Sequence, residues 1–208
     1  MTVRLGQLDM ESCPKYAEWQ LREYLKDAGV GQRFLGCSFE TYVPATPSQS
    51  VALKMAQQYA ESLPCDKSLL IIGPCGVGKT HLAVAIAREA LKVNIGDVVI
   101  RQVPEVLGEI RAAISRGDEN AHIALERYAN ANLLILDDLG AEKITEWVRE
   151  QLFLLVDARY QEMLPTVLTS NNSLEEIEQL LGPRIASRLA GMCQGVVIDG
   201  PDHRIATA

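Results

Sequence analysis

The sequence reads Gly73-Pro74-Cys75-Gly76-Val77-Gly78-Lys79-Thr80 between an apolar run at 69–72 and a helical pattern of small and apolar residues at 82–90. Strand, glycine loop and helix in this order form the context in which G-x-x-x-x-G-K-[ST] binds phosphate. Small residues let the loop turn tightly, so that its N–H groups point inward, and the helix N-terminus adds a partial positive charge. The stretch therefore predicts a nucleotide-binding loop; the alternative is a glycine-rich turn that binds nothing.

The end of this loop carries the side chains with predicted chemical roles. Lys79 is expected to reach the β- and γ-phosphates, and Thr80 to place its hydroxyl on Mg²⁺. His81, the next residue, is counted with the loop as nucleotide-binding. Cys75 lies inside the loop, so alkylation there is expected to block nucleotide binding.

A second apolar run, at 132–136, leads directly into Asp137 and Asp138. Neighbouring side chains on a strand point in opposite directions, so the two carboxylates can do different work. Asp137 is predicted to hold Mg²⁺ through water, and Asp138 to orient or polarise an attacking water. A solvated turn is the alternative for this pair alone. Beside a phosphate loop, the pair indicates hydrolysis as well as binding.

Composition limits the function classes. The chain has 208 residues, 48% of them hydrophobic, which suits one α/β core. The formal net charge of −7 provides no global basic field, so any nucleic-acid contact must come from a local patch or from assembly. Five scattered cysteines suggest neither a zinc site nor a disulfide framework. With no signal pattern or membrane span, we expect a cytoplasmic protein that does not contact membranes.

The periodicity predicts a short N-terminal helical extension over 1–35 and one core domain over 36–208, which the resemblance described below implies is an AAA+ ATPase core. The extension either packs on the core or docks on a partner. Ser48 is expected to cap a helix that runs to Ser62, and Ser173 to form a capping box with Glu176. Strands are expected at 68–73, 97–100, 132–136, 166–169 and 196–198, with helices between them. This alternation predicts an α/β fold, a parallel five-stranded sheet sandwiched by helices, with ligands at the carboxyl ends of the strands.

With these motifs in place, the sequence from Phe39 to Arg204 resembles the AAA+ ATPases of the replicative helicase-loader group, DnaC and DnaI, and their transposition relative IstB. The resemblance is carried by a Walker A motif at 73–80, an Asp-Asp form of Walker B at 133–140, and the segments 169–171 and 183–189. It implies a P-loop fold of the AAA+/ASCE class with ATP and Mg²⁺ as cofactors. Little or no C-terminal lid is expected, because four residues follow Arg204.

The resemblance also implies residue roles. Asn171 would be sensor 1, bonded to the γ-phosphate or the lytic water; a helix-capping turn is the alternative. Arg188 would be an arginine finger inserted into a neighbouring subunit's site, with Arg184 in support; two surface arginines are the alternative. Arg204 would act as sensor 2. The implied catalytic set is Lys79, Asp138, Asn171, Arg184 and Arg188.

The sequence gives weaker signals for the residues that bind the base and for those that contact DNA. The segment Phe39–Val43 is expected to wrap the base, and the absence of N-K-x-D favours ATP over GTP. Residues 104–130 predict two polar helices broken near Gly117 and Asp118. Arg111, Arg116 and Arg127 in this segment are either DNA contacts or part of a solvated face.

Four functions compete. The leading one is an ATP-fuelled switch that forms an ATP-dependent homo-oligomer on single-stranded DNA and binds and releases a replicative ring helicase. The second is a helper ATPase that loads a transposase. The third is a small-molecule kinase, which would need a basic lid that the sequence does not suggest. The fourth is a nucleotide-binding scaffold with negligible turnover.

Overall fold

A computed structural model describes residues 14–115 and 121–204. Its sheet has five strands in the order β2-β3-β4-β1-β5, and every pairing is parallel. The strands are β1 (Ser68–Ile72), β2 (Val98–Gln102), β3 (Leu133–Leu139), β4 (Thr166–Ser170) and β5 (Cys193–Val197). The predicted α/β class and the parallel five-stranded sheet are therefore confirmed.

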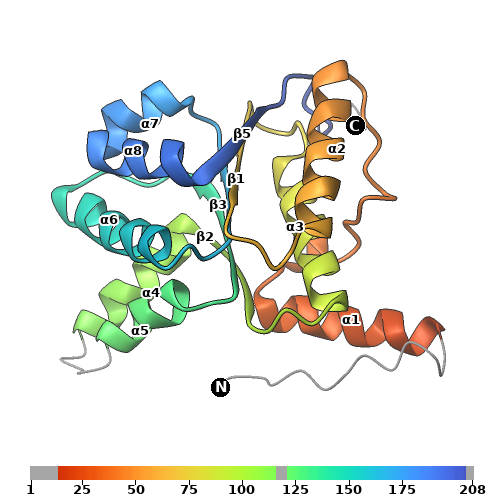
Figure 1. Ribbon diagram of the computed structural model, residues 1–208, viewed down its shortest axis with the longest axis horizontal. Coiled ribbons are helices and arrows are strands. Elements are labelled where there is room, and N and C mark those ends of the chain that lie inside the picture. The colour runs from red at the N-terminus through yellow and green to blue at the C-terminus, as the bar shows by residue number, and fades with distance from the viewer. Residues whose placement is uncertain (1–13, 116–120, 205–208) are drawn as a thin grey trace.

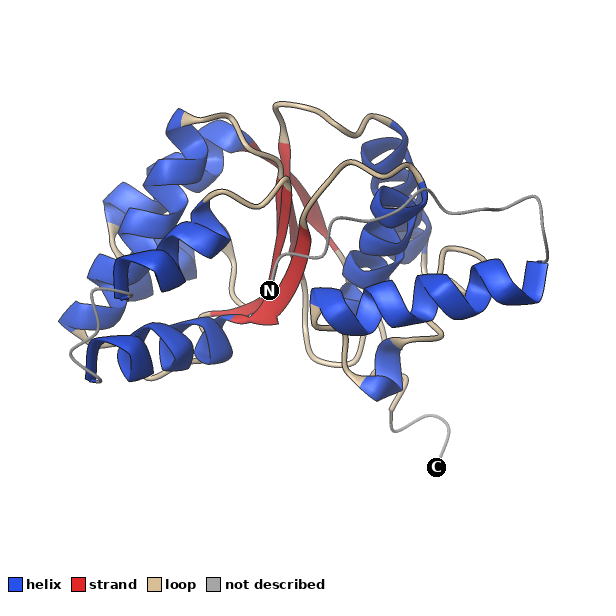
Figure 2. Cartoon of the chain, turned by 90° about the horizontal axis from the view of Figure 1, so that it is seen from below, coloured by secondary structure: helices blue, strands red, loops and turns tan. Residues whose placement is uncertain are grey.

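Helices cover both faces of the sheet. Figure 1 shows α1, α2 and α3 on one side and α4 to α8 on the other, and Figure 2 shows the sheet between these two layers. The helices are α1 (Pro14–Ala28), α2 (Pro47–Glu61), α3 (Lys79–Lys92), α4 (Val103–Ser115), α5 (Ala121–Ala129), α6 (Glu146–Gln161), α7 (Leu174–Leu181) and α8 (Pro183–Met192), with a 3₁₀ turn η1 (Gln32–Phe34). The predicted break near Gly117 and Asp118 lies outside the described residues.

Each face of the sheet has its own apolar core. In β1, Leu69 and Ile71 pack into the cluster beneath α1, α2 and α3, whereas Leu70 packs into the cluster beneath the other helix layer. This alternation follows from the two-residue period of a strand. Each of these side chains is almost fully buried, which contributes about 1.5–3 kcal/mol per residue. Burial on both faces explains why the strand sequences are continuously apolar.

The N-terminal helix α1 packs on this core. Its Leu21, Leu25 and Ala28 are buried in the cluster that contains β1 and α3. On its outer side, Tyr16 and Trp19 are exposed and stack with a ring-centroid distance of 5.8 Å. Of the two alternatives for the extension, packing on the core is therefore observed for α1.

The start of α2 differs from the prediction. Thr46, not Ser48, is the N-cap: its hydroxyl accepts from the N–H of Gln49, whose side chain completes a capping box. Pro47 occupies the first helical turn, where its missing N–H costs nothing, and this moves the start forward. The Ser48 hydroxyl donates to the carbonyl of Asp199 at 2.9 Å, and the Thr46 hydroxyl donates to the same carbonyl at 2.8 Å. The predicted capping box of Ser173 and Glu176 at α7 is confirmed.

Within the described ranges, no helix is long and apolar enough to cross a membrane.

Candidate nucleotide site

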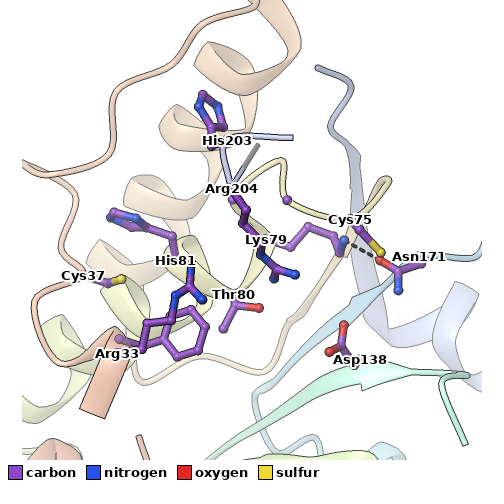
Figure 3. A pocket seen from close by; sticks show the side chains of 13 residues that line it. Arg33, Cys37, Cys75, Lys79, Thr80, His81, Asp138, Asn171, His203 and Arg204 are labelled. Carbon is purple, nitrogen blue, oxygen red and sulfur yellow. Dashed lines mark hydrogen bonds between the residues drawn. The ribbon is translucent and has the colours of Figure 1, made fainter. Parts of the chain in front are cut away.

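A pocket of about 330 Å³ lies at the carboxyl ends of β1, β3 and β4 (Figure 3). It is lined by Arg33, Phe34, Cys37, Cys75, Gly76, Gly78, Lys79, Thr80, His81, Asp138, Asn171, His203 and Arg204. The glycine loop, one aspartate of the acidic pair and Asn171 therefore meet in one place. This is the position at which open α/β sheets bind ligands.

The glycine loop has a shape that requires glycine. Gly78 has φ = 101°, and a Cβ built there would lie 2.6 Å from Cε2 of Tyr42. The preceding carbonyl, that of Val77, accepts bonds from the Tyr42 hydroxyl at 3.3 Å and from Nε2 of Gln49 at 3.2 Å. Gln49 is fully buried, so these bonds are shielded from water. The loop is thus held from behind while its other side lines the pocket.

Lys79 is held at the loop by three acceptors. Its Nζ donates to the carbonyls of Gly73 and Pro74, both at 2.8 Å, and to Oδ1 of Asn171 at 2.7 Å. Burial lowers the pKa of Lys79, and the nearby carboxylate of Asp138 opposes this shift. The ammonium is therefore fixed at the mouth of the loop, within reach of an anion in the pocket.

Asp137 lies against Thr80 beneath the pocket. The Thr80 hydroxyl lies 3.1 and 3.0 Å from the two carboxylate oxygens, and the Thr169 hydroxyl donates to one of them at 2.6 Å. Burial raises the pKa of Asp137, and the bond from Thr169 opposes this shift. A hydroxyl and a carboxylate side by side are hard oxygen ligands of the kind that Mg²⁺ takes. The residues present therefore fit this ion.

Asp138 turns its carboxylate to the pocket because the strand is irregular there. Its φ is 60°, and the pairing of β3 with β4 shifts register between Leu136 and Leu139. The N–H of Asp138 donates to the Thr169 hydroxyl at 3.0 Å, so Thr169 contacts both aspartates. Sequence reasoning missed this role of Thr169; the available signal was a hydroxyl residue two positions before Asn171, near the carboxyl end of a strand.

Comparison with known proteins identifies the family. The sequence model of the IstB-like ATP binding protein family matches residues 48–207. The chain belongs to this family.

Relatives and solved structures agree with this assignment. The chain is 29% identical over 163 residues to the replicative helicase loader DnaC of Escherichia coli K12, covering 78% of this chain and 66% of that protein. It is 26% identical over 196 residues to the replicative helicase loader DnaI of Bacillus subtilis 168, covering 86% of this chain and 62% of that protein. A crystal structure of the DnaC helicase loader superposes with a TM-score of 0.74 at 27% identity, covering 81% of this chain and 99% of that one. The fold is that of an AAA+ P-loop ATPase.

Within this IstB-like chain, Arg184 and Arg188 lie away from the pocket. The Arg188 Nε donates to Oδ1 of Asp157 at 2.7 Å, and its guanidinium lies 5.0 Å from the Tyr160 ring centroid. The Arg184 guanidinium lies 5.9 Å from the ring centroid of Phe153. Neither arginine is among the residues that line the chain's own nucleotide pocket.

Arg204, by contrast, lines the pocket of its own chain. The segment before it is tied to the glycine loop, because the N–H of His203 donates to the carbonyl of Gly76 at 3.2 Å. The N–H of Arg204 donates to Oδ1 of Asp202 at 2.8 Å. The chain end at 199–204 therefore crosses the loop, although the fold has no lid domain over the described residues.

One side of the pocket has lining residues that the sequence did not predict. Arg33, Phe34 and Cys37 line it, whereas the segment Phe39–Val43 contributes no lining residue over the described chain. Tyr42 of that segment packs beneath the glycine loop. That the segment wraps a base stays a prediction.

His81, at the start of α3, faces this side of the pocket. Its Nε2 lies 2.9 Å from the carbonyl of Ser38 and 3.2 Å from the Thr41 hydroxyl. Burial lowers the pKa of His81. A neutral imidazole thus fixes the turn at Ser38–Thr41, before α2, against the start of α3.

The arginines considered as DNA contacts have aromatic neighbours. Arg111 lies 4.6 Å from the ring centroid of Trp147, and Arg127 lies 5.8 Å from that of Tyr128. Arg116 lies outside the described residues. The two described arginines therefore have intramolecular contacts as well as access to solvent.

Proposed function

We propose that this protein hydrolyses ATP as an assembly switch of the helicase-loader type, acting with single-stranded DNA and a replicative ring helicase. The contact that carries the proposal is the bond from Lys79 to Asn171, which places a phosphate-binding cation beside the polar residue that directly follows β4. The family membership and the likeness to DnaC and DnaI support the partner class. The chain spans 66% and 62% of the length of these two relatives.

The hydrolytic step follows from the positions of the pocket side chains. Lys79 and the loop N–H groups bind the β- and γ-phosphates, which replace the carbonyl and amide oxygens now bonded to Nζ. Thr80 and Asp137 would hold Mg²⁺, which supplies charge neutralisation on the phosphate oxygens. Asp138 accepts a hydrogen bond from the attacking water, and Asn171 holds the γ-phosphate in line.

The negative charge that develops on the transferred phosphoryl group calls for a further cation. We assign this role to Arg188 of a neighbouring subunit, with Arg184 in support, because neither lies in its own chain's pocket. In the isolated chain Asp157 holds the Arg188 guanidinium in place. Arg204 of the same chain contacts the bound phosphates from the other side, as sensor 2 does. The active form is therefore an ATP-dependent homo-oligomer.

Binding to DNA depends on this assembly. A net charge of −7 gives the single chain a weak field for a polyanion. Several copies on one strand gain affinity through multivalency, with a strong dependence on salt.

An IstB-like helper that acts with a transposase is the second candidate. It is favoured by the family match over residues 48–207, whose description is that of an IstB-like ATP binding protein. Both candidates use the same ATPase site, so they differ in the partner alone.

The decisive experiment measures steady-state ATP hydrolysis with and without single-stranded DNA over a range of protein concentrations. Wild type is compared with Arg188→Ala and with Asp157→Asn, which breaks the same intramolecular contact but keeps the arginine. We expect turnover to rise with DNA and with concentration, to fall at least about 10³-fold in Arg188→Ala and to survive in Asp157→Asn. Turnover indifferent to concentration, DNA and Arg188 would exclude an assembly switch.

A further inference from the structure

The 3₁₀ turn η1 forms part of the nucleotide pocket, although it belongs to the N-terminal extension. Its Arg33 and Phe34 line the pocket together with Cys37. Phe34 and Thr80 also line an adjacent cavity of about 130 Å³ that reaches Asp137. In Figure 3, Arg33, Cys37 and His81 lie on the side of the pocket opposite Asn171 and Asp138. The turn therefore faces the part of a nucleotide that projects away from Lys79 and Asn171.

Arg33 is a cation available to a ligand. It is solvent-exposed, and over the described residues no carboxylate lies within ion-pair distance of its guanidinium. A guanidinium offers several N–H donors in one plane and stacks well on flat rings. Placed beside a phenyl ring, it suits the ribose and base of a nucleotide.

The turn is held by two core arginines, one on each side. Before it, Nη1 of Arg101 in β2 donates to the carbonyl of Ala28 at 2.8 Å. After it, Nη1 of Arg88 in α3 donates to the carbonyl of Leu35 at 3.4 Å. The Leu35 side chain is fully buried, which anchors that end of the turn in the core.

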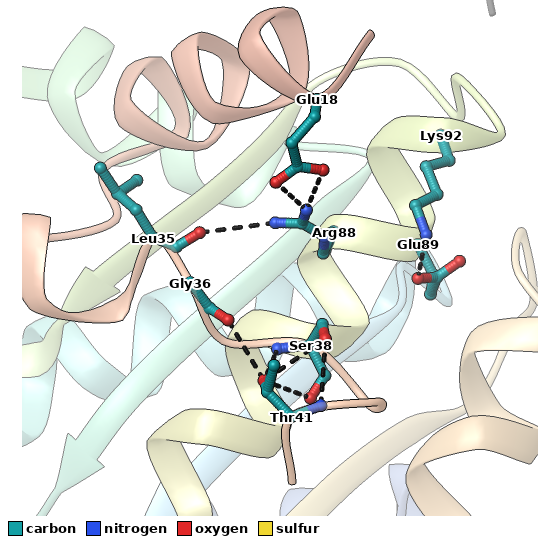
Figure 4. A network of polar contacts seen from close by, with 8 residues as sticks. All are labelled: Glu18, Leu35, Gly36, Ser38, Thr41, Arg88, Glu89 and Lys92. Atoms are coloured by element: carbon teal, nitrogen blue, oxygen red, sulfur yellow. Dashed lines mark hydrogen bonds and ion pairs between the residues drawn. The ribbon is translucent and has the colours of Figure 1, made fainter. Parts of the chain in front are cut away.

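Arg88 is in turn oriented by the N-terminal helix. Its Nη2 contacts both carboxylate oxygens of Glu18 in α1, and Figure 4 shows this pair directly above the bond to Leu35. The Arg88 side chain is 8% exposed and that of Glu18 is 51% exposed. A buried guanidinium keeps its position only when its donors are paired, so Glu18 fixes the direction in which Arg88 points.

We propose that Arg33 is a nucleotide-binding residue on the base side of the pocket, and that Glu18 and Arg88 are positioning residues for its turn. The inference rests on the proposed ATP site and adds the residues that recognise the nucleoside part of the ligand. It also makes the N-terminal helix a determinant of nucleotide affinity.

The test compares two ligands that differ in the nucleoside. Isothermal titration with Mg²⁺ and either unlabelled ATP or inorganic tripolyphosphate is run on the full chain. Arg33→Ala should weaken ATP binding about tenfold, the loss expected for a charge-assisted hydrogen bond. Glu18→Gln, which keeps an oxygen acceptor for Arg88 but removes the charge of the pair, should weaken it roughly threefold. Tripolyphosphate affinity should change less than about twofold in both variants, because that ligand lacks the ribose and base.

A matched control lies on α3, the helix that carries Arg88. Lys92 pairs with Glu89 at 2.7 Å one turn further along α3 and does not contact the turn (Figure 4). Lys92→Gln should leave the affinity for both ligands unchanged. Equal weakening of ATP and tripolyphosphate in Arg33→Ala, or unchanged ATP affinity, would overturn the inference. Failure of the wild type to bind either ligand would instead refute the proposed nucleotide site. Lys79→Ala is expected to bind neither ligand, and it shows what loss of that site looks like in the titration.

Discussion

Lys79 and Asn171, 92 positions apart in the sequence, are joined by a hydrogen bond of 2.7 Å from Nζ to Oδ1. One residue begins α3 and the other follows β4, and the parallel pairing of β1 with β4 brings them together. Until a phosphate is present, the amide oxygen satisfies one of the three donors of a nearly buried ammonium. The same geometry places Asn171 beside the γ-phosphate once Lys79 binds it.

Asn171→Ala should therefore separate binding from turnover. We expect kcat to fall by about 10²-fold, as when one preorganised polar group at a transition state is removed, with ATP affinity within about threefold of wild type. Asn172→Ala is the matched control, since Asn172 is the neighbouring residue of the same type and does not line the pocket. Equal losses in both variants would assign Asn171 a structural role at the start of α7.

The two aspartates should respond differently to loss of charge. Asp138→Asn should abolish turnover and spare ATP binding, because a neutral amide can neither take up a proton from the attacking water nor polarise it as a carboxylate does. Asp137→Asn should weaken Mg²⁺-dependent ATP binding. ATP titrations with and without Mg²⁺ distinguish them, and equal loss of binding and turnover in Asp138→Asn would contradict its role.

Asp137→Asn should also stabilise the nucleotide-free protein near neutral pH. Because burial raises the pKa of Asp137, the folded state binds the proton more tightly than the unfolded state does. The free energy of unfolding therefore falls as pH rises from the ordinary carboxyl pKa to the folded one, and the penalty persists above it. The neutral side chain of asparagine avoids this penalty for burying a charge. We expect Tm to rise by a few degrees, since about 1 kcal/mol is worth roughly 2–4 °C in a chain of this size. A lower Tm for Asp137→Asn by calorimetry at pH 7 would show that the hydroxyl bonds outweigh burial.

Gly78→Ala should destabilise the protein by about 1–3 kcal/mol. The positive φ and the contact of 2.6 Å with Tyr42 both oppose a Cβ at this position. Gly108→Ala in α4 is the control, because that position has no heavy atom within 4 Å of a built Cβ and should gain about 0.5–1 kcal/mol. Urea unfolding measures both. An unchanged free energy of unfolding in Gly78→Ala would mean that the loop can relax around the methyl group.

His81 should make stability depend on pH just below neutrality. Because burial lowers its pKa, the unfolded chain takes up a proton near pH 6.5 while the folded protein does not. The free energy of unfolding therefore falls as pH drops below about 6.5, until the folded pKa is reached. Urea unfolding from about pH 7.5 to 5.5 should show a shallower slope for His81→Gln, which keeps a donor for the Ser38 carbonyl. Identical slopes in wild type and His81→Gln would exclude His81 as the source of the pH dependence.

The elements with strong local patterns could be predicted from sequence. The glycine loop, the strands and the capping box at Ser173 depend on periodicity and turn chemistry within a few residues, and each overlaps its predicted range. The strand predicted at 132–136 extends to Leu139, and the one predicted at 196–198 runs from Cys193 to Val197. The start of α2 was missed because Thr46 and Ser48 are both good caps, and Pro47 between them occupies the first helical turn. In the fold, both hydroxyls donate to the carbonyl of Asp199, 153 and 151 positions away, and the Thr46 hydroxyl also accepts from the N–H of Gln49.

Arg159 is a core residue whose role also could not be predicted from the local sequence. Its side chain is 1% exposed and donates to the carbonyls of Tyr128, Ala129, Ala131 and Pro165 and to the Thr166 hydroxyl. These bonds tie the segment before β3 to the start of β4, and burial lowers the pKa of Arg159 to about 10. An arginine on a helix normally predicts a solvated face, so its neighbours alone do not reveal this role.

By itself, the sequence determined that this chain forms a parallel sheet with a phosphate loop and an acidic pair at the strand ends, because those features follow from short-range patterns. Only the tertiary structure decided that Thr169 contacts both aspartates, that Arg188 lies outside its own pocket and that Arg33 lies inside it. The physical reason is that these contacts join segments distant in the chain. Their partners are selected by sheet order and helix packing, which a local pattern of residues does not encode.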